Sequence, residues 1–232
     1  MTIHEIVLDD GGMNLLSSAM LGWIGERVAE LQGCSVAEEP GGPALEAPQP
    51  ILILRSARPH LFAAGADMAE MRGFGAGEAE VLARQGQEVM AAIERLPFVT
   101  VAMIDGDCFG GALDLALAFD LRFAAPASRF SHPGAKIGIV TGFGGTSRWR
   151  KVLAPAAAKQ LFLANRVLTA EDALSIGLVD CVGDSFDDEL GRLTALDPRT
   201  TRFLKELTAH DDRLTASQRL LLAERLGRLY DF

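Results

Sequence analysis

The chain has 232 residues, a hydrophobic content of 49% and a formal net charge of −9. That length and hydrophobicity are sufficient for a globular protein with a buried core. The acidic balance and the lack of a basic run argue against nucleic-acid binding. Charged residues, glycine or proline interrupt every apolar run before it reaches membrane-spanning length.

The first residues and the cysteines indicate the compartment. The N-terminal segment MTIHEIVLDD lacks a basic region followed by an apolar one, so no secretory signal is expected. Cys34, Cys108 and Cys181 are odd in number, scattered and without C-x-x-C spacing. Such cysteines are typical of free thiols in a reducing compartment. We therefore expect a cytoplasmic protein without a disulfide framework.

The N-terminal part of the chain alternates strand and helix patterns. Residues 4–9 alternate as a first strand, and residues 15–31 carry apolar side chains at helical spacing, with Asn14, Ser17 or Ser18 as the cap. A segment rich in Pro, Gly, Ala and Glu follows and predicts a loop. Residues 51–55, ILILR, then predict a buried strand that ends in a small-residue turn, AAGAD.

The central part repeats the same order of elements. Residues 78–96 predict a long helix that Pro97 ends. The run VTVAMI predicts a strand, and Gly110 and Gly111 lie where it gives way to the apolar helix ALDLALAF. Glycine at such a turn permits unusual backbone angles and close approach of a ligand. Asp114 lies in the first turn of this helix.

The C-terminal part is mainly helical. A strand is expected near residues 119–125, followed by the glycine-rich loop SHPGAKIGIVTGFGGTS. Further helices are predicted from about residue 145 and over residues 155–165, 198–208 and 215–230. The segment TAED resembles a capping box that opens a short helix, and LVDCV predicts a last core strand.

Together, three segments resemble the enoyl-CoA hydratase/isomerase (crotonase) family. HLFAAGADMAEM is similar to the family's F-S-A-G-A-D-L-x-E-M signature, and IDGDCFGGALDLALAFDLRFAA is similar to its G-x-x-x-G-G-G-x-E-L-A-L-x-C-D signature. A third matching segment spans residues 130–182. The resemblance implies an α/β fold, a right-handed spiral of ββα units over residues 1–183 with a helical region over 184–232. It also implies a homotrimer or hexamer.

The resemblance further implies an acyl-CoA enzyme that stabilises a thioester enolate. By position, the backbone N–H groups of Ala66 and Gly111 would hold the enolate oxygen, and Asp114 would act in proton transfer. The expected substrate-binding residues are Ala64, Gly65, Asp67, Gly110, His132 and Gly134. Coenzyme A would enter as part of the substrate, with no permanently bound cofactor and no metal.

The chain departs from the family at its acid–base groups. Family hydratases carry one Glu where Asp114 stands and a second where Gly134 stands, so a single carboxylate is expected here. Hydration, isomerisation and a related lyase step remain open, and so does help from His132 or a bound anion. On this interpretation a Glu at position 134 would restore hydration. The alternative is a non-catalytic acyl-CoA-binding or assembly protein of the same fold.

Overall fold

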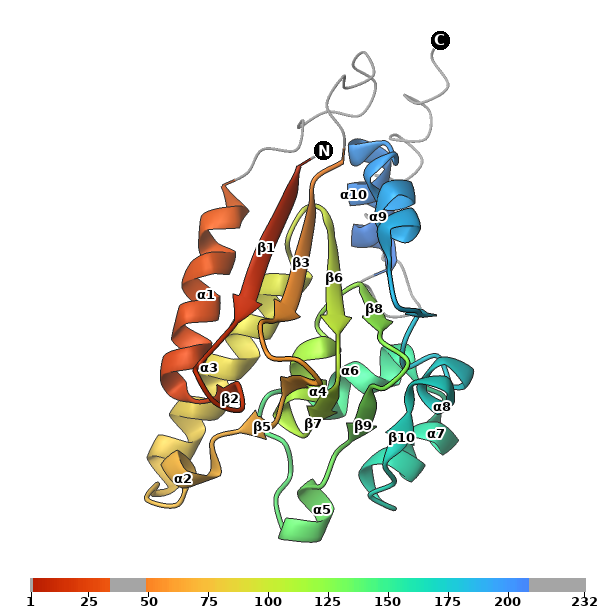
Figure 1. The fold of residues 1–232 in the computed structure, drawn as a ribbon. Helices are drawn as coiled ribbons and strands as arrows, with labels where there is room; N and C mark the ends of the chain where they lie inside the picture. The colour runs from red at the N-terminus through yellow and green to blue at the C-terminus, as the bar shows by residue number, and fades with distance from the viewer. Residues whose placement is uncertain (1, 34–48, 209–232) are drawn as a thin grey trace, which may run out of the picture.

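The computed structural model describes residues 2–33 and 49–208. Within them, the larger sheet is entirely parallel (Figure 1). Its strands follow the spatial order β1 (Ile3–Leu8), β3 (Ile51–Ser56), β6 (Val99–Ile104), β8 (Leu121–Ala124) and β11 (Cys181–Val182). A parallel sheet covered on both faces has near-continuous apolar strands, which explains the run ILIL in β3.

A smaller sheet lies beyond the carboxyl ends of these strands. Its spatial order is β10 (Leu168–Thr169), β9 (Arg129–Ser131), β7 (Asp107–Phe109) and β4 (Leu61–Ala63). A short parallel pair, β2 (Leu15–Leu16) with β5 (Gly65–Ala66), lies beside it. Three successive passes of the chain, β3–β4, β6–β7 and β8–β9, therefore each add a strand to the larger sheet and then one to the smaller sheet.

Helices follow each pair of strands and cover the sheets (Figure 1). They are α1 (Ser18–Gln32), α2 (Met68–Met71), α3 (Ala76–Glu94), α4 (Gly111–Ala116), α5 (Gly134–Ile137), α6 (Gly145–Val152), α7 (Pro155–Phe162), α8 (Ala170–Ser175), α9 (Asp187–Thr194) and α10 (Pro198–Thr208). The order β3–β4–α3, β6–β7–α4 and β8–β9–α5 is the predicted spiral of ββα units. The predicted fold is confirmed.

The larger sheet separates two apolar cores. Leu52 and Leu54 of β3 pack with α1, α3 and α4 in the main core, whereas Ile51 and Ile53 face the other side. There Phe186 and neighbouring residues of α9 cover the sheet. Because successive strand side chains point to opposite faces, one apolar strand contributes to both cores. The main core fixes α3 and α4, the helices nearest the predicted site.

Local expectations are met with some shifts. Helix α10 has the predicted bounds, and Thr169 and Asp172 form the predicted capping box of α8. Helix α1 begins later than expected because Leu15 and Leu16 pair with β5, and the cap is Ser17. The glycine-rich loop contains the short helix α5.

The predicted loop between α1 and β3 lies largely outside the described residues. The predicted helix over residues 215–230 lies entirely outside them. No helix within residues 2–33 and 49–208 is both long and apolar enough to cross a bilayer.

Candidate active site

The two predicted glycine turns meet in the structure. A Cβ atom built on Gly65, whose φ is +103°, would stand 2.7 Å from the carbonyl oxygen of Phe109 and 3.1 Å from the backbone nitrogen of Gly111. A Cβ on Gly111 would stand 3.3 Å from the backbone nitrogen of Ala66. Only glycine allows backbones to approach this closely. The contact brings the backbone nitrogens of Ala66 and Gly111 into one small region.

Regular structure on both sides holds this contact in place. Ala66 belongs to β5, which pairs in parallel with β2, with Leu16 opposite Ala66. Gly111 is the first residue of α4, and Gly110 before it has a φ of +55°. The first N–H groups of a helix have no acceptor within that helix. The N–H of Gly111 is thus placed to bind a ligand oxygen.

An apolar cavity of about 340 Å³ opens over the two turns. Its lining includes the predicted site residues Ala64, Gly65, Ala66, Gly110, Gly111, His132 and Gly134. Apolar side chains from α2, α3, α5 and the following loop complete it, among them Met68, Met71, Leu82, Ile137, Val140 and Phe143. Such a mostly apolar pocket with a few polar groups is typical of a small-molecule site.

Asp67 and Asp114 are not among the lining residues of this cavity. The Asp67 carboxylate caps α2 and accepts hydrogen bonds from the backbone N–H groups of Ala69 and Glu70. This contact gives Asp67 a structural role at the edge of the site. Its predicted contact with substrate stays a prediction.

Asp114 is fully buried behind the cavity wall. Its Oδ2 atom accepts a hydrogen bond from the Thr141 hydroxyl, and its Oδ1 atom lies 3.5 Å from Nε2 of His132. A Cβ atom on Gly145 would stand 1.7 Å from that same Oδ1. The segment containing residues 132–145 therefore encloses the carboxylate, and His132 lies both beside it and on the cavity wall.

Phe143 forms the inner wall of the cavity, and the sequence analysis did not identify it. A Cβ on Gly86 would stand 2.3 Å from Phe143 Cδ1, and a Cβ on Gly111 would stand 3.0 Å from Cδ2. The ring is thus wedged between α3 and α4. A glycine inside an apolar helical pattern, such as Gly86, was the available signal. Arg148 donates to the Phe143 carbonyl oxygen at 3.0 Å and to Glu94 at 2.7 Å, which holds this segment on α3.

Gly134 is not an open position awaiting a carboxylate. A Cβ there would stand 2.5 Å from the carbonyl oxygen of Ile139, a backbone atom, and 3.3 Å from the His132 ring. No real side chain tolerates the first distance without a shift of the backbone. The expectation that a Glu at this position would simply restore a hydratase site is therefore not supported by the packing.

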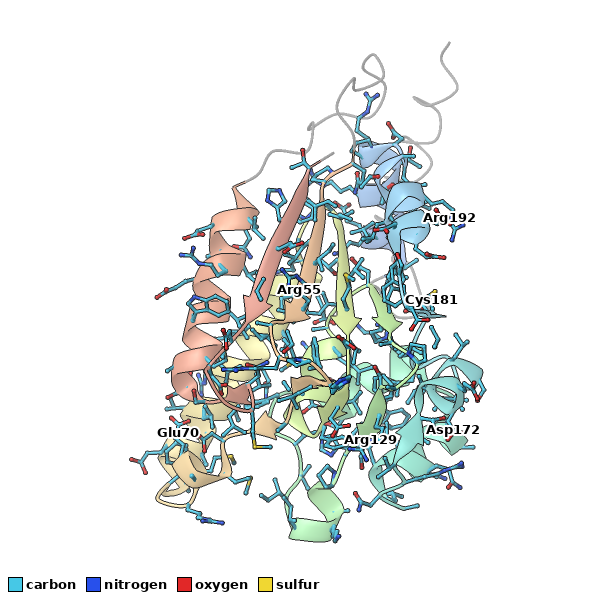
Figure 2. All side chains as sticks on the ribbon, in the orientation of Figure 1. Arg55, Glu70, Arg129, Asp172, Cys181 and Arg192 are labelled. Atoms are coloured by element: carbon cyan, nitrogen blue, oxygen red, sulfur yellow. The ribbon has the colours of Figure 1, made fainter. Side chains whose placement is uncertain are left out.

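Two arginines in and after β3 are engaged in ion pairs. Nη2 of Arg55, which is labelled in Figure 2, lies 3.0 Å from Oε2 of Glu5. Nη2 of Arg58 lies 2.9 Å from Oδ1 of Asp9. Among residues 2–33 and 49–208, no group of three or more His, Cys, Asp and Glu side chains is placed to hold a metal ion.

Comparison with known proteins places the chain in a family. The family model described as enoyl-CoA hydratase/isomerase matches residues 49–210, more than half of the chain. The chain belongs to the enoyl-CoA hydratase/isomerase family. Residues 60–71 and 104–125, on which the resemblance was first based, lie inside the matched region.

Individual relatives in this family are similar over much of the chain. A crotonyl-CoA hydratase from Syntrophomonas wolfei is 38% identical over 140 residues, which are 60% of this chain and 52% of that protein. An enoyl-CoA isomerase/hydratase, fer4, from Mycosarcoma maydis is 34% identical over 183 residues, 78% of this chain and 65% of that protein. The chain thus spans about half to two thirds of the length of these relatives.

Solved structures support the same fold. The structure of Pseudomonas aeruginosa DspI matches with a TM-score of 0.84 at 24% identity, covering 99% of this chain and 92% of that one. At this identity the match shows the fold alone.

Proposed function

We propose that this protein binds a coenzyme A thioester and stabilises the enolate of its acyl group. The observation that supports the proposal most directly is the contact between the two glycine turns, which gathers the Ala66 and Gly111 N–H groups beside an apolar cavity. A thioester oxygen bound there would gain negative charge during reaction. Removing one such donor typically costs about 3 kcal/mol of barrier, or 10²–10³-fold in rate.

The chemistry we propose is proton transfer at the carbon next to the thioester. The C–H electron pair becomes the enolate double bond, and the carbonyl π pair moves to the oxygen held by the two N–H groups. Returning the proton to the same carbon gives exchange, and returning it at the γ-carbon gives isomerisation. Asp114 supplies the carboxylate of this site. The site has no carboxylate at position 134 to orient water, so hydration is expected to be slower than isomerisation.

Coenzyme A is proposed as part of the substrate rather than as a resident cofactor. The cavity lining is mainly apolar, which suits an acyl chain. A non-catalytic acyl-CoA-binding protein is the competing function. The two differ in one observable: both bind acyl-CoA, but only the enzyme exchanges or moves a proton on it.

Assembly and compartment complete the proposal. By family resemblance we propose a homotrimer or a pair of trimers in the cytoplasm. Light scattering over a wide concentration range tests the assembly, and a monomer mass throughout would refute it.

The proposed function is tested first by binding and then by a matched pair of variants. Calorimetry with butyryl-CoA and crotonyl-CoA is expected to show saturable binding, and no binding up to millimolar concentration would refute the function. Gly111→Pro removes one N–H at the first helical position, where proline is tolerated. Gly111→Ala adds the same Cβ and keeps the N–H.

The Cβ atom of either variant meets the same neighbours, Phe143 and the Ala66 nitrogen. Turnover of 3-enoyl-CoA is expected to fall about 100-fold further in Gly111→Pro than in Gly111→Ala. Circular dichroism checks that both variants fold. Equal turnover in two folded variants would exclude the Gly111 N–H from the oxyanion site.

A further inference from the structure

Two buried polar atoms at the site face each other without a hydrogen bond. Oδ1 of Asp114 and Nε2 of His132 are both enclosed, and neither has a hydrogen-bond partner within the described part of the chain. They lie 3.5 Å apart. Leaving buried polar groups unpaired is unfavourable. Catalytic hydrogen bonds are often long in ligand-free structures and tighten when substrate binds.

The surroundings of His132 fix the orientation of its ring. Its ring packs on Phe162 with centroids 4.8 Å apart. Its backbone directly follows β9, where the Ser131 carbonyl accepts a hydrogen bond from the Gly110 N–H at 2.9 Å. The imidazole is thereby tied to the same turn that carries the Gly111 N–H.

The other ring nitrogen of His132, Nδ1, lies near Gly134. Nδ1 of His132 stands 3.3 Å from where a Cβ on Gly134 would be, and both residues line the cavity. Asp114 is fully buried and does not line it. The imidazole therefore lies beside both Asp114 and the acyl cavity, with Nε2 next to the carboxylate and Nδ1 next to Gly134.

We propose that His132 exchanges the proton with the acyl group and that Asp114 is its positioning residue. This rests on the proposed function. In this arrangement Nε2–H donates to Oδ1 of Asp114, which leaves Nδ1 with its lone pair toward the cavity. The Thr141 hydroxyl holds the other carboxylate oxygen, so the carboxylate cannot turn away.

The proton transfer balances without any further reactant. Nδ1 takes the α-hydrogen as a proton, the C–H pair forms the enolate, and the charge on the thioester oxygen is met by the two N–H groups. The imidazolium that forms is stabilised by the Asp114 carboxylate. Return of the proton restores both the imidazole and the acyl group.

The test is hydrogen exchange at the α-carbon of butyryl-CoA in D₂O, followed by NMR. We expect His132→Gln to slow exchange by about 10²–10⁴-fold, the range for a lost general base, while the dissociation constant of butyryl-CoA changes less than about threefold. Asp114→Asn is expected to slow exchange as well. The double variant should be no slower than His132→Gln alone, because groups that act as a unit are not additive.

A control and a rescue separate catalysis from structure. His4 also stacks on a phenylalanine, Phe98, but does not line the cavity, so His4→Gln should exchange at the wild-type rate. Added imidazole should restore exchange in His132→Ala and not in Asp114→Asn.

The outcomes distinguish the inference from the function on which it rests. If wild type binds and exchanges butyryl-CoA and His132→Gln does so equally fast, the inference is wrong and the proposed function stands. A loss confined to Asp114→Asn would also overturn it and assign the proton transfer to Asp114 itself. If wild type binds no acyl-CoA, the proposed function fails and the inference with it.

Discussion

The Asp114 carboxylate lies directly against the backbone of Gly145, where a Cβ atom would stand 1.7 Å from Oδ1. Gly145 is the first residue of α6 and Asp114 lies in α4, so this contact joins the two helices at the site. The absence of a side chain at residue 145 is what makes room for the carboxylate.

We expect Gly145→Ala to displace Asp114 and to reduce turnover of the acyl substrate more than tenfold. The added methyl group cannot be accommodated without moving the carboxylate or α6, and such overpacking typically costs about 1–3 kcal/mol of stability. Urea unfolding and 3-enoyl-CoA turnover measure the two effects. The matched control is Gly191→Ala in α9, where a Cβ meets nothing within 4 Å.

The control variant Gly191→Ala should be more stable than wild type by about 0.5–1 kcal/mol because alanine has the higher helix propensity. Its turnover should be unchanged. A Gly145→Ala protein with wild-type turnover would show that the position of Asp114 is unimportant.

Gly134→Glu is expected to lower stability and to give no gain in crotonyl-CoA hydration. Its Cβ would stand 2.5 Å from the Ile139 carbonyl oxygen, so the backbone of this segment must shift before a carboxylate reaches the cavity. Lys136→Glu is the control, because it adds a Glu on the exposed side of the same short helix without that contact. Thermal unfolding measures the stability of both variants, and an assay with crotonyl-CoA measures their hydration rates. Hydration that rises in Gly134→Glu would contradict the packing argument.

Gly86→Ala is expected to destabilise the protein although alanine is the better helix former. Helix propensity favours the change by about 1 kcal/mol, but the Cβ would meet the Phe143 ring at 2.3 Å, and overpacking costs about 1–3 kcal/mol. Gly77→Ala in the same helix meets nothing within 4 Å and should not destabilise. Adding Phe143→Leu to Gly86→Ala should recover part of the loss. Urea unfolding of wild type, Gly77→Ala, Gly86→Ala and the double variant measures these stabilities. Equal stability of Gly77→Ala and Gly86→Ala would refute the prediction.

Cys108 is expected to resist alkylation in the native protein. Burial raises the pKa of its thiol well above the usual value, and the nearby Asp114 and Asp107 carboxylates raise this pKa further. At pH 8 the thiol therefore stays neutral, and only the thiolate reacts. Iodoacetamide labelling followed by peptide mass spectrometry should find Cys108 modified in urea and unmodified without it. Labelling of the native Cys108 at the rate of a free thiol would contradict this.

Much of the fold could be predicted because its signals are local. The apolar strands at residues 51–56 and 99–104, the capping box of α8 and the bounds of α10 follow from patterns within a few residues. The start of α1 could not be predicted in this way. Leu15 and Leu16 continue the helical spacing, but they pair with β5, a segment about 50 residues away, and that pairing decides their conformation.

The sequence by itself determined where the two glycine turns, Asp114 and the apolar helices lie along the chain, because these depend on backbone freedom and side-chain pattern. Only the tertiary structure decided how they combine. The segment over residues 132–145 folds across α4, so that Gly134 and Gly145 become contact positions and His132 lies between Asp114 and the cavity. His132 and Gly145 lie 18 and 31 positions from Asp114 in the sequence. These contacts depend on how distant segments of the chain pack together, which no local pattern records.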